Sequence, residues 1–260
     1  MIISLNGKRA LVTGGGTGLG QSIVKSLESA GATVAFTSRK HSSLSNTLKI
    51  LDEPKKHFPV KIDVNKKNNI KKLYKILNKK FGKIDILINN VGHTLNITDP
   101  FTNINNWKKI MDLNCFTAIE MVNVFIKDMK KKNWGRIVNI TSIAGMEISG
   151  PSTYNISKHA LTAYTKSVGR QLAIEKRNIV MTAVAPGILM TQEGRWGKTF
   201  TAKSKHTKDY IKHRTALKRF GKMDEITGII TFLCSDRASF FHSTVIHADG
   251  GQSRNYQSNI

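Results

Sequence analysis

Short apolar and β-branched segments alternate with amphipathic helical segments along most of the chain. The segments are RALVT (9–13), TVAFT (33–37), PVKI (59–62), IDILIN (84–89), RIVNIT (136–141), IVMTAV (179–184) and, later, STVIH (243–247). This alternation is typical of βαβ units, which build a parallel sheet with helices on both faces. The sequence therefore predicts an α/β fold with a doubly wound, mostly parallel seven-stranded sheet.

The length of 260 residues would allow one large domain or two small ones. No linker, internal repeat or low-complexity block marks a boundary. We therefore expect a single domain over residues 1–260. A stretch at about 188–218 is rich in Lys, Thr and Gly, and we expect it to be a loop-like insertion or lid over the sheet edge.

The chain is strongly basic, with 41 Lys and Arg against 17 Asp and Glu and a formal charge of +24. Such a charge would attract nucleic acid, an anionic membrane or an acidic substrate. The lysines are spread along the whole chain without a zinc finger or an aromatic-interleaved basic stretch, so we do not expect nucleic-acid binding. A compositional bias towards lysine is the simpler interpretation.

Neither a membrane span nor a disulfide is expected. No apolar run approaches the roughly 20 residues that a membrane helix needs, and no signal-peptide pattern is present. Cys115 and Cys234 lie in apolar segments without metal-ligand spacing or a CxxC motif. We predict a cytoplasmic protein with reduced, buried cysteines and no metal site.

A glycine-rich run, TGGGTGLG (13–20), directly follows the first strand and leads into a helix. Glycines at such a turn let the backbone approach a pyrophosphate, which then lies at a helix N-terminus with unpaired N–H groups. A tight turn without a ligand is the alternative, but the position between strand and helix favours a dinucleotide site. The predicted contacts in this run are Gly14, Thr17, Gly18, Leu19 and Gly20.

The end of the second strand indicates which dinucleotide binds. An NAD-binding protein is expected to place an acidic residue there for the ribose 2′-hydroxyl. This chain has Ser38 and Arg39 instead, and an arginine offers a planar cation to a 2′-phosphate. NADP(H) is therefore favoured over NAD(H), although a solvated surface arginine is the alternative in so basic a chain.

A Tyr–Lys pair in YNISK (154–158) would lie on one face of a helix because the two residues are four apart. In a lysine-rich helix the pair could also be a surface coincidence. However, Ser142 stands twelve residues earlier at the end of a strand, and Asn114 lies in the helix after the fourth strand.

Together these motifs resemble the short-chain dehydrogenase/reductase family over nearly the whole chain. The resemblance rests on TGGGTGLG, Asp63, NNVG (89–92), Asn114, Ser142, YNISK, Pro186-Gly187 and ADGG (248–251). It implies a Rossmann-type fold and a hydride transfer between a nicotinamide cofactor and a carbonyl group or secondary alcohol.

The resemblance also implies the catalytic roles. Tyr154 would be the proton donor or acceptor, and Ser142 would orient the substrate oxygen. Lys158 would hold the cofactor ribose and, together with the positive nicotinamide ring of the oxidised cofactor, lower the pKa of the phenol, for which a change from ~10 to about 7 needs roughly 4 kcal/mol. Asn114 would hold a water that links Lys158 to solvent.

Further cofactor contacts are implied after the third, fourth and sixth strands. Asp63 and Val64 match an adenine-contacting pair, and the NNVG motif with Asn90 and Gly92 supports the sheet beside the cofactor. Pro186, Gly187 and Ile188 would lie along the nicotinamide carboxamide, with Thr191 as a further contact.

The substrate is less constrained. Between Arg195 and Arg219 there are nine basic residues and one acidic residue, Asp209. An anionic substrate would fit, such as the 3-oxoacyl thioester of an acyl carrier protein, and a solvated helix face is the alternative. A sugar or nucleotide-sugar substrate is the main rival, because the cover segment with Trp196 is longer than in the acyl-carrier reductases.

Two further expectations concern function class and assembly. A non-catalytic NADP-sensing protein on the same fold would be expected to lose Tyr154, Lys158 or Ser142, and all three are present. The resemblance implies a homotetramer or a dimer formed through helices at about 104–131 and 153–176.

Overall fold

Seven parallel strands form one sheet in the order β3-β2-β1-β4-β5-β6-β7. The computed structural model describes residues 3–190 and 205–254. The strands are β1 (Arg9–Val12), β2 (Thr33–Ser38), β3 (Phe58–Lys61), β4 (Ile86–Asn89), β5 (Trp134–Ile140), β6 (Asn178–Pro186) and β7 (Val245–Ala248). The predicted sheet is confirmed, and every strand ends within two residues of its expected bounds.

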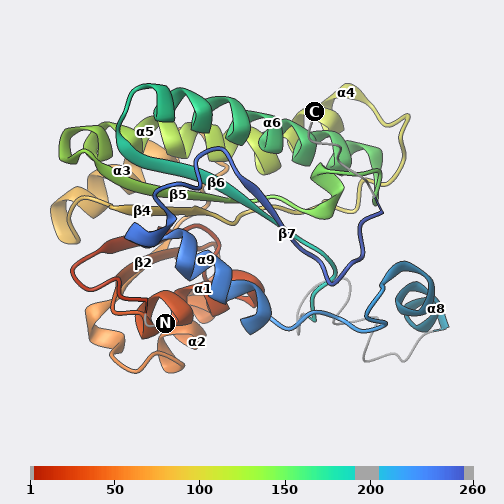
Figure 1. Ribbon diagram of the computed structural model, residues 1–260, viewed down its shortest axis with the longest axis horizontal. Helices are drawn as coiled ribbons and strands as arrows, with labels where there is room; N and C mark the ends of the chain where they lie inside the picture. Colours follow the sequence, from red (N-terminus) through yellow and green to blue (C-terminus); the bar gives the residue numbers. More distant parts are fainter. Residues whose placement is uncertain (1–2, 191–204, 255–260) are drawn as a thin grey trace.

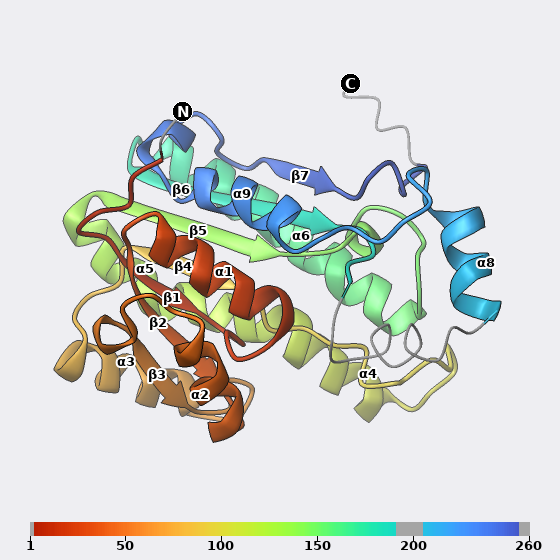
Figure 2. The same ribbon diagram turned by 90° about the horizontal axis from the view of Figure 1, so that it is seen from below.

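Helices cover both faces of the sheet (Figures 1 and 2). One face carries α1 (Gly18–Ser29), α2 (His41–Lys49) and α9 (Asp224–Leu233), and the other carries α3 (Asn69–Lys80), α5 (Thr117–Lys132) and α6 (Ser152–Ile174). Within the described ranges, no helix is long and apolar enough to cross a membrane.

The strands read as continuous apolar runs because both of their faces are buried. Side chains alternate between the faces of a strand. Ala10 and Val12 therefore pack in the core beside α1 and α9, whereas Leu11 packs in the core beside α3 and α5. Both Cys115 and Cys234 are free and buried, as expected.

Two expected elements differ in the structure. The long helix expected at about 104–131 is divided into α4 (Ile104–Met111) and α5 by a π-helical turn at Asp112–Phe116. The segment expected to be loop-like contains the helix α8 (Lys205–Arg214). With only Tyr210 and Ile211 as large apolar residues, α8 has no helical hydrophobic period that the sequence analysis could detect.

A buried arginine joins strands β5 and β6 to the end of α9. Arg136 on β5 is completely buried. Its guanidinium donates hydrogen bonds to the carbonyl oxygens of Ser235 (2.9 Å) and Asn178 (3.1 Å), and it lies 4.6 Å from the Trp134 ring centroid. Burial lowers the pKa of Arg136, which the nearby Asp236 carboxylate partly offsets.

We predict that Arg136→Leu lowers the free energy of unfolding by about 3 kcal/mol, because buried carbonyl groups lose their donors. Urea denaturation followed by circular dichroism measures the change. Arg237→Leu, at an exposed position of the same region, is the control and is expected to change little. Equal stabilities of the two variants would contradict the role of Arg136.

Candidate active site

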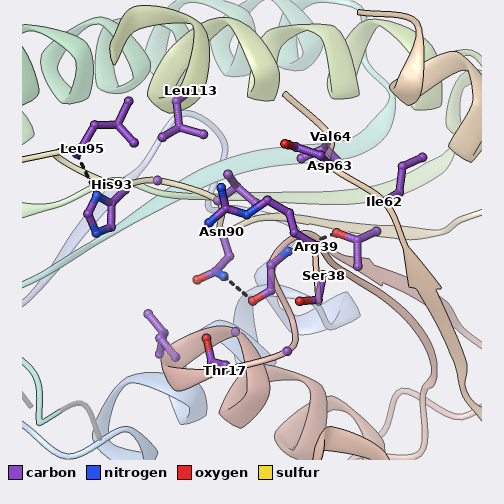
Figure 3. A pocket seen from close by; sticks show the side chains of 17 residues that line it. Thr17, Ser38, Arg39, Ile62, Asp63, Val64, Asn90, His93, Leu95 and Leu113 are labelled. Carbon is purple, nitrogen blue, oxygen red and sulfur yellow. Dashed lines mark hydrogen bonds between the residues drawn. The ribbon is translucent and has the colours of Figure 1, made fainter. Parts of the chain in front are cut away.

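The loops at the carboxyl ends of β1 to β4 surround a cavity of about 420 Å³ (Figure 3). It lies where the strand order reverses between β1 and β4, which is the usual ligand position in doubly wound sheets. The predicted cofactor residues that line it are Gly14, Thr17, Leu19, Gly20, Ser38, Arg39, Asp63, Val64, Asn90 and Gly92. The structure therefore brings together most of the set that the sequence placed in separate loops.

The glycine run folds back on itself so closely that a side chain is excluded at Gly20. A Cβ on Gly20 would overlap the carbonyl oxygen of Gly14, and Gly14 and Gly18 have φ values of +67° and +53°. Helix α1 then starts with no side-chain cap from Thr17 and no acidic residue in its first turn. Its first N–H groups are thus suited to an anion such as a pyrophosphate.

Polar side chains behind the loop hold it in place. Asn90 donates its backbone N–H to Thr13 Oγ1 (2.9 Å) and its side-chain amide to the Thr13 carbonyl (3.0 Å). The Gly14 N–H donates to Thr37 Oγ1 (3.2 Å). Asn90 of the NNVG motif thus fixes the glycine loop to the end of β1, and the expected role of the motif beside a bound cofactor stays a prediction.

Arg39 extends into the cavity between Asp63 and the glycine run (Figure 3). It is exposed, and within the part of the chain that the structure describes its guanidinium forms no hydrogen bond or ion pair. Ser38 lies beside it. A guanidinium without an ion-pair partner in the lining of this cavity suits a 2′-phosphate, so the residues present fit an NADP-type dinucleotide.

Lys158 is buried at the other end of the site, with an exposed fraction of 2%. Its ammonium group donates a hydrogen bond to the carbonyl oxygen of Ile140 (2.9 Å) at the end of β5. Burial lowers the pKa of Lys158 to about 8. Helix α6 therefore holds a lysine that can change protonation state close to neutral pH.

Tyr154, one helical turn before Lys158, forms a side-chain hydrogen bond with Ser142. Burial raises the pKa of Tyr154 to about 12, against the lowering effect of that hydrogen bond. The lowering expected from Lys158 together with the nicotinamide ring stays a prediction. The lysine Nζ lies 5.7 Å from the phenol ring centroid and donates to the carbonyl oxygen of Ile140.

Gly92 connects the cavity to this centre. A Cβ at Gly92 would lie 2.9 Å from both Asn114 Oδ1 and Lys158 Nζ, so the absence of a side chain at Gly92 lets these two groups lie close to the loop after β4. Asn114, in the π-helical turn, donates its amide to the carbonyls of Ile110 and His93 (3.0 Å each) and accepts from the His93 N–H (2.9 Å). Its side chain fixes the loop after β4, and its expected water contact stays a prediction.

Pro186, Gly187 and Ile188 at the end of β6 do not line the large cavity. A Cβ at Gly187 would lie 2.8 Å from both Asp249 Cα and Gln252 Oε1. The glycine is therefore needed for contact with the turn after β7. Ile188 borders a second cavity of about 250 Å³, and Thr191 lies outside the described residues.

The sequence analysis missed several residues of this region, among them His93, Leu113 and Gln252. His93 and Leu113 line the large cavity, and each adjoins a residue that was identified, Gly92 or Asn114. Gln252 accepts a hydrogen bond from the Ile188 N–H (2.8 Å). Its position directly after ADGG was the available signal, but its partner lies 64 residues away in the sequence.

Comparison with known proteins identifies relatives that match nearly the whole chain. Residues 14–253 match a protein family described as enoyl-(acyl carrier protein) reductase. The 3-oxoacyl-(acyl-carrier-protein) reductase of Aquifex aeolicus is 32% identical over 257 residues, which cover 96% of this chain and 99% of that protein. A mouse protein named dehydrogenase/reductase SDR family member 4 is 29% identical over 95% of this chain and 88% of its own length.

Solved structures share the fold closely. A 3-oxoacyl-(acyl-carrier-protein) reductase from Agrobacterium tumefaciens with NADP bound has a TM-score of 0.88 at 25% identity and covers 96% of each chain. L-sorbose reductase from Gluconobacter frateurii, complexed with NADPH and L-sorbose, has a TM-score of 0.90 at 24% identity and covers 98% of this chain and 100% of its own.

We predict a pH-dependent stability difference between wild type and Lys158→Met. The pKa of Lys158 is about 8 in the folded protein, against the ordinary lysine value of 10.5 that applies to the unfolded chain. The unfolded chain binds more protons between these pH values, so the stability of wild type relative to the variant rises with pH across this window, by about 3 kcal/mol.

Urea unfolding of both proteins at pH 7.5 and pH 10.5 measures this difference. Lys166→Met, at an exposed position of the same helix, is the control and should show no such trend. A constant difference between wild type and Lys158→Met at both pH values would contradict a depressed pKa of Lys158.

Proposed function

Since the chain belongs to the short-chain dehydrogenase/reductase family, we propose that it is an NADP(H)-dependent oxidoreductase acting on a carbonyl group or a secondary alcohol. The observation that carries the proposal is the contact through Gly92. Gly92 lines the cavity of about 420 Å³ and lies against the buried Lys158, which shares helix α6 with Tyr154, the hydrogen-bond partner of Ser142.

Several residues would hold the cofactor. The first turn of α1 and the glycines before it would bind the pyrophosphate, and Arg39 with Ser38 would bind the 2′-phosphate. Asp63 and Val64 would contact the adenine. The NADP in the related reductase from Agrobacterium tumefaciens supports this choice over NAD. When bound, the cofactor supplies or accepts the hydride.

Tyr154 is the proposed general acid in the direction of reduction. With a pKa of about 12 the phenol is protonated at neutral pH, so it can donate its proton to the substrate oxygen as negative charge develops there. Ser142, which hydrogen-bonds the phenol, would orient the same oxygen. In the direction of oxidation the proton moves the opposite way.

Lys158 then stabilises the phenolate that remains on Tyr154 after the proton has been donated. A positive charge nearby favours the ionised phenol, and a lysine with a pKa of about 8 can also pass a proton on. We propose that Asn114 and a water near it complete the path to solvent.

For the substrate we propose a 3-oxoacyl thioester first and a sugar or nucleotide sugar second. Curated relatives at 30 to 32% identity are named 3-oxoacyl-(acyl-carrier-protein) reductases. The cover segment at about 188–218 includes α8, whose exposed Lys208, Lys212 and Arg214 suit an anionic substrate. We also propose that the protein is cytoplasmic and that it forms a homotetramer or dimer through α5 and α6.

We predict that Tyr154→Phe lowers kcat by about a thousandfold, the contribution expected of a general acid. NADPH binding, followed by nucleotide fluorescence, should be unchanged. Oxidation of NADPH by acetoacetyl thioesters and keto sugars is followed by absorbance at the nicotinamide band.

Tyr164→Phe is the matched control for Tyr154→Phe. Tyr164 lies on the same helix, and burial also raises its pKa to about 12, yet it lies outside the proposed centre. Comparable losses in the two variants would indicate that both tyrosines stabilise α6 and that Tyr154 has no chemical role.

We predict that Arg39→Ala weakens NADPH binding by about tenfold or more, the loss expected for a charge-assisted hydrogen bond. NADH binding should change little because NADH has no 2′-phosphate. Lys40→Ala, at the next exposed position, is the control. Parallel losses for both nucleotides would count against a 2′-phosphate contact at Arg39.

A further inference from the structure

A buried glutamine connects three parts of the molecule beside the candidate active site. Gln252 follows the ADGG motif and has an exposed fraction of 7%. Its Oε1 accepts a hydrogen bond from the Ile188 N–H (2.8 Å), and its Nε2 donates to Tyr210 Oη on α8 (2.9 Å). One amide therefore joins the end of β6 to α8.

The turn that carries this glutamine, residues 249–254, has a well-defined internal structure. The Asp249 carboxylate accepts hydrogen bonds from the N–H groups of Gly251 (3.0 Å) and Ser253 (2.9 Å). Gly250 and Gly251 have φ values of +61° and +74°, a region that favours glycine. The ADGG sequence thus builds a turn that points the side chain of Gln252 inward.

The same 249–254 turn also contacts the loop that follows Ser142. The Arg254 N–H donates to Glu147 Oε2 (2.8 Å), and the Arg254 guanidinium donates to the carbonyl of His213 on α8 (3.1 Å). The Glu147 carbonyl in turn accepts from the side chain of Asn155 (2.8 Å), the neighbour of Tyr154.

Tyr210 completes the connection from α8. Its hydroxyl forms a side-chain hydrogen bond with Ser149, in the same loop as Glu147, in addition to the one with Gln252. Burial raises the pKa of Tyr210. In Figure 2, α8 lies at the end of the molecule to which the carboxyl ends of β6 and β7 point.

We propose that Gln252 and Tyr210 are positioning residues that couple α8 to the Ile188 segment and to the loop after Ser142, and so set the affinity for substrate. This inference rests on the proposed function, because it assigns α8 to the substrate side of that site. The two side chains touch neither the reacting groups nor the large cavity. They act through the segments that they hold.

Two variants distinguish the hydrogen bond from Gln252 to Tyr210 from the hydrogen bond between Gln252 and the Ile188 N–H. Tyr210→Phe removes only the hydroxyl on α8 and leaves the Gln252 contact to Ile188 in place. Gln252→Met has a similar length but removes both hydrogen bonds and leaves the buried Ile188 N–H without an acceptor. Asp209→Asn, at an exposed position next to Tyr210, is the control.

Limited trypsin digestion of the purified full-length protein tests the coupling without any substrate. Cleavage after Lys208, Lys212 and Arg214 should be about tenfold faster in Tyr210→Phe and in Gln252→Met, as expected when a buried hydrogen bond that opposes local opening is lost. Cleavage in α3 of the same samples serves as the internal reference and should not change.

Steady-state kinetics with acetoacetyl thioesters or keto sugars tests the functional part. For Tyr210→Phe, the substrate KM should rise about tenfold with kcat and the KM for NADPH unchanged, because Gln252 still accepts from the Ile188 N–H. For Gln252→Met, kcat should fall as well, because the Ile188 segment is also released. Asp209→Asn should match the wild type.

The outcomes distinguish this inference from the proposed function. Wild-type rates of α8 cleavage and a wild-type KM in both variants would overturn the positioning role while leaving the enzyme assignment intact. Faster α8 cleavage with wild-type KM and kcat would overturn the control of substrate affinity. A wild-type protein that turns over no carbonyl substrate would refute the proposed function, and the functional part of this inference with it.

Discussion

The close approach of Gly20 to the Gly14 carbonyl is the constraint on which the cofactor half of the site depends. A side chain at Gly20 would overlap that oxygen, so helix α1 can start against the end of β1 only without one. This start leaves the N–H groups of the first turn directed at the cavity. Thr13, Thr37 and Asn90 then hold the loop from behind, and the rest of the cavity follows from parallel strands ending at one edge.

The reaction half of the site depends on burial. Burial lowers the pKa of Lys158 to about 8 and raises the pKa of Tyr154 to about 12. The directions differ because a low-dielectric environment disfavours the charged form of each group, the ammonium of lysine and the phenolate of tyrosine. The site is thus prepared to hold a neutral phenol that can give up a proton when negative charge develops beside it. Gly92, which lines the cavity, lies against Lys158 of this pair.

The basic composition has different consequences in different places. Most lysines lie exposed and scattered, so the net charge of +24 says little about a partner. Arg39 differs, because its guanidinium faces the cavity without an ion-pair partner among the described residues. Arg136 differs in the other direction, because it is fully buried and bonded to carbonyl oxygens. The environment of each arginine, and not the net charge of the chain, therefore distinguishes a candidate ligand contact such as Arg39 from a structural residue such as Arg136.

By itself the sequence determined the sheet, its helices and most of the candidate site, because these follow from local patterns: apolar periodicity, glycine spacing and the four-residue step from Tyr154 to Lys158. Only the tertiary structure revealed the π-helical turn at Asn114, the rise in the pKa of Tyr154 and the link from Gln252 to Ile188. The last two depend on groups far apart in the chain. Desolvation and hydrogen bonding are set by the neighbours that folding brings together, and no local pattern records them.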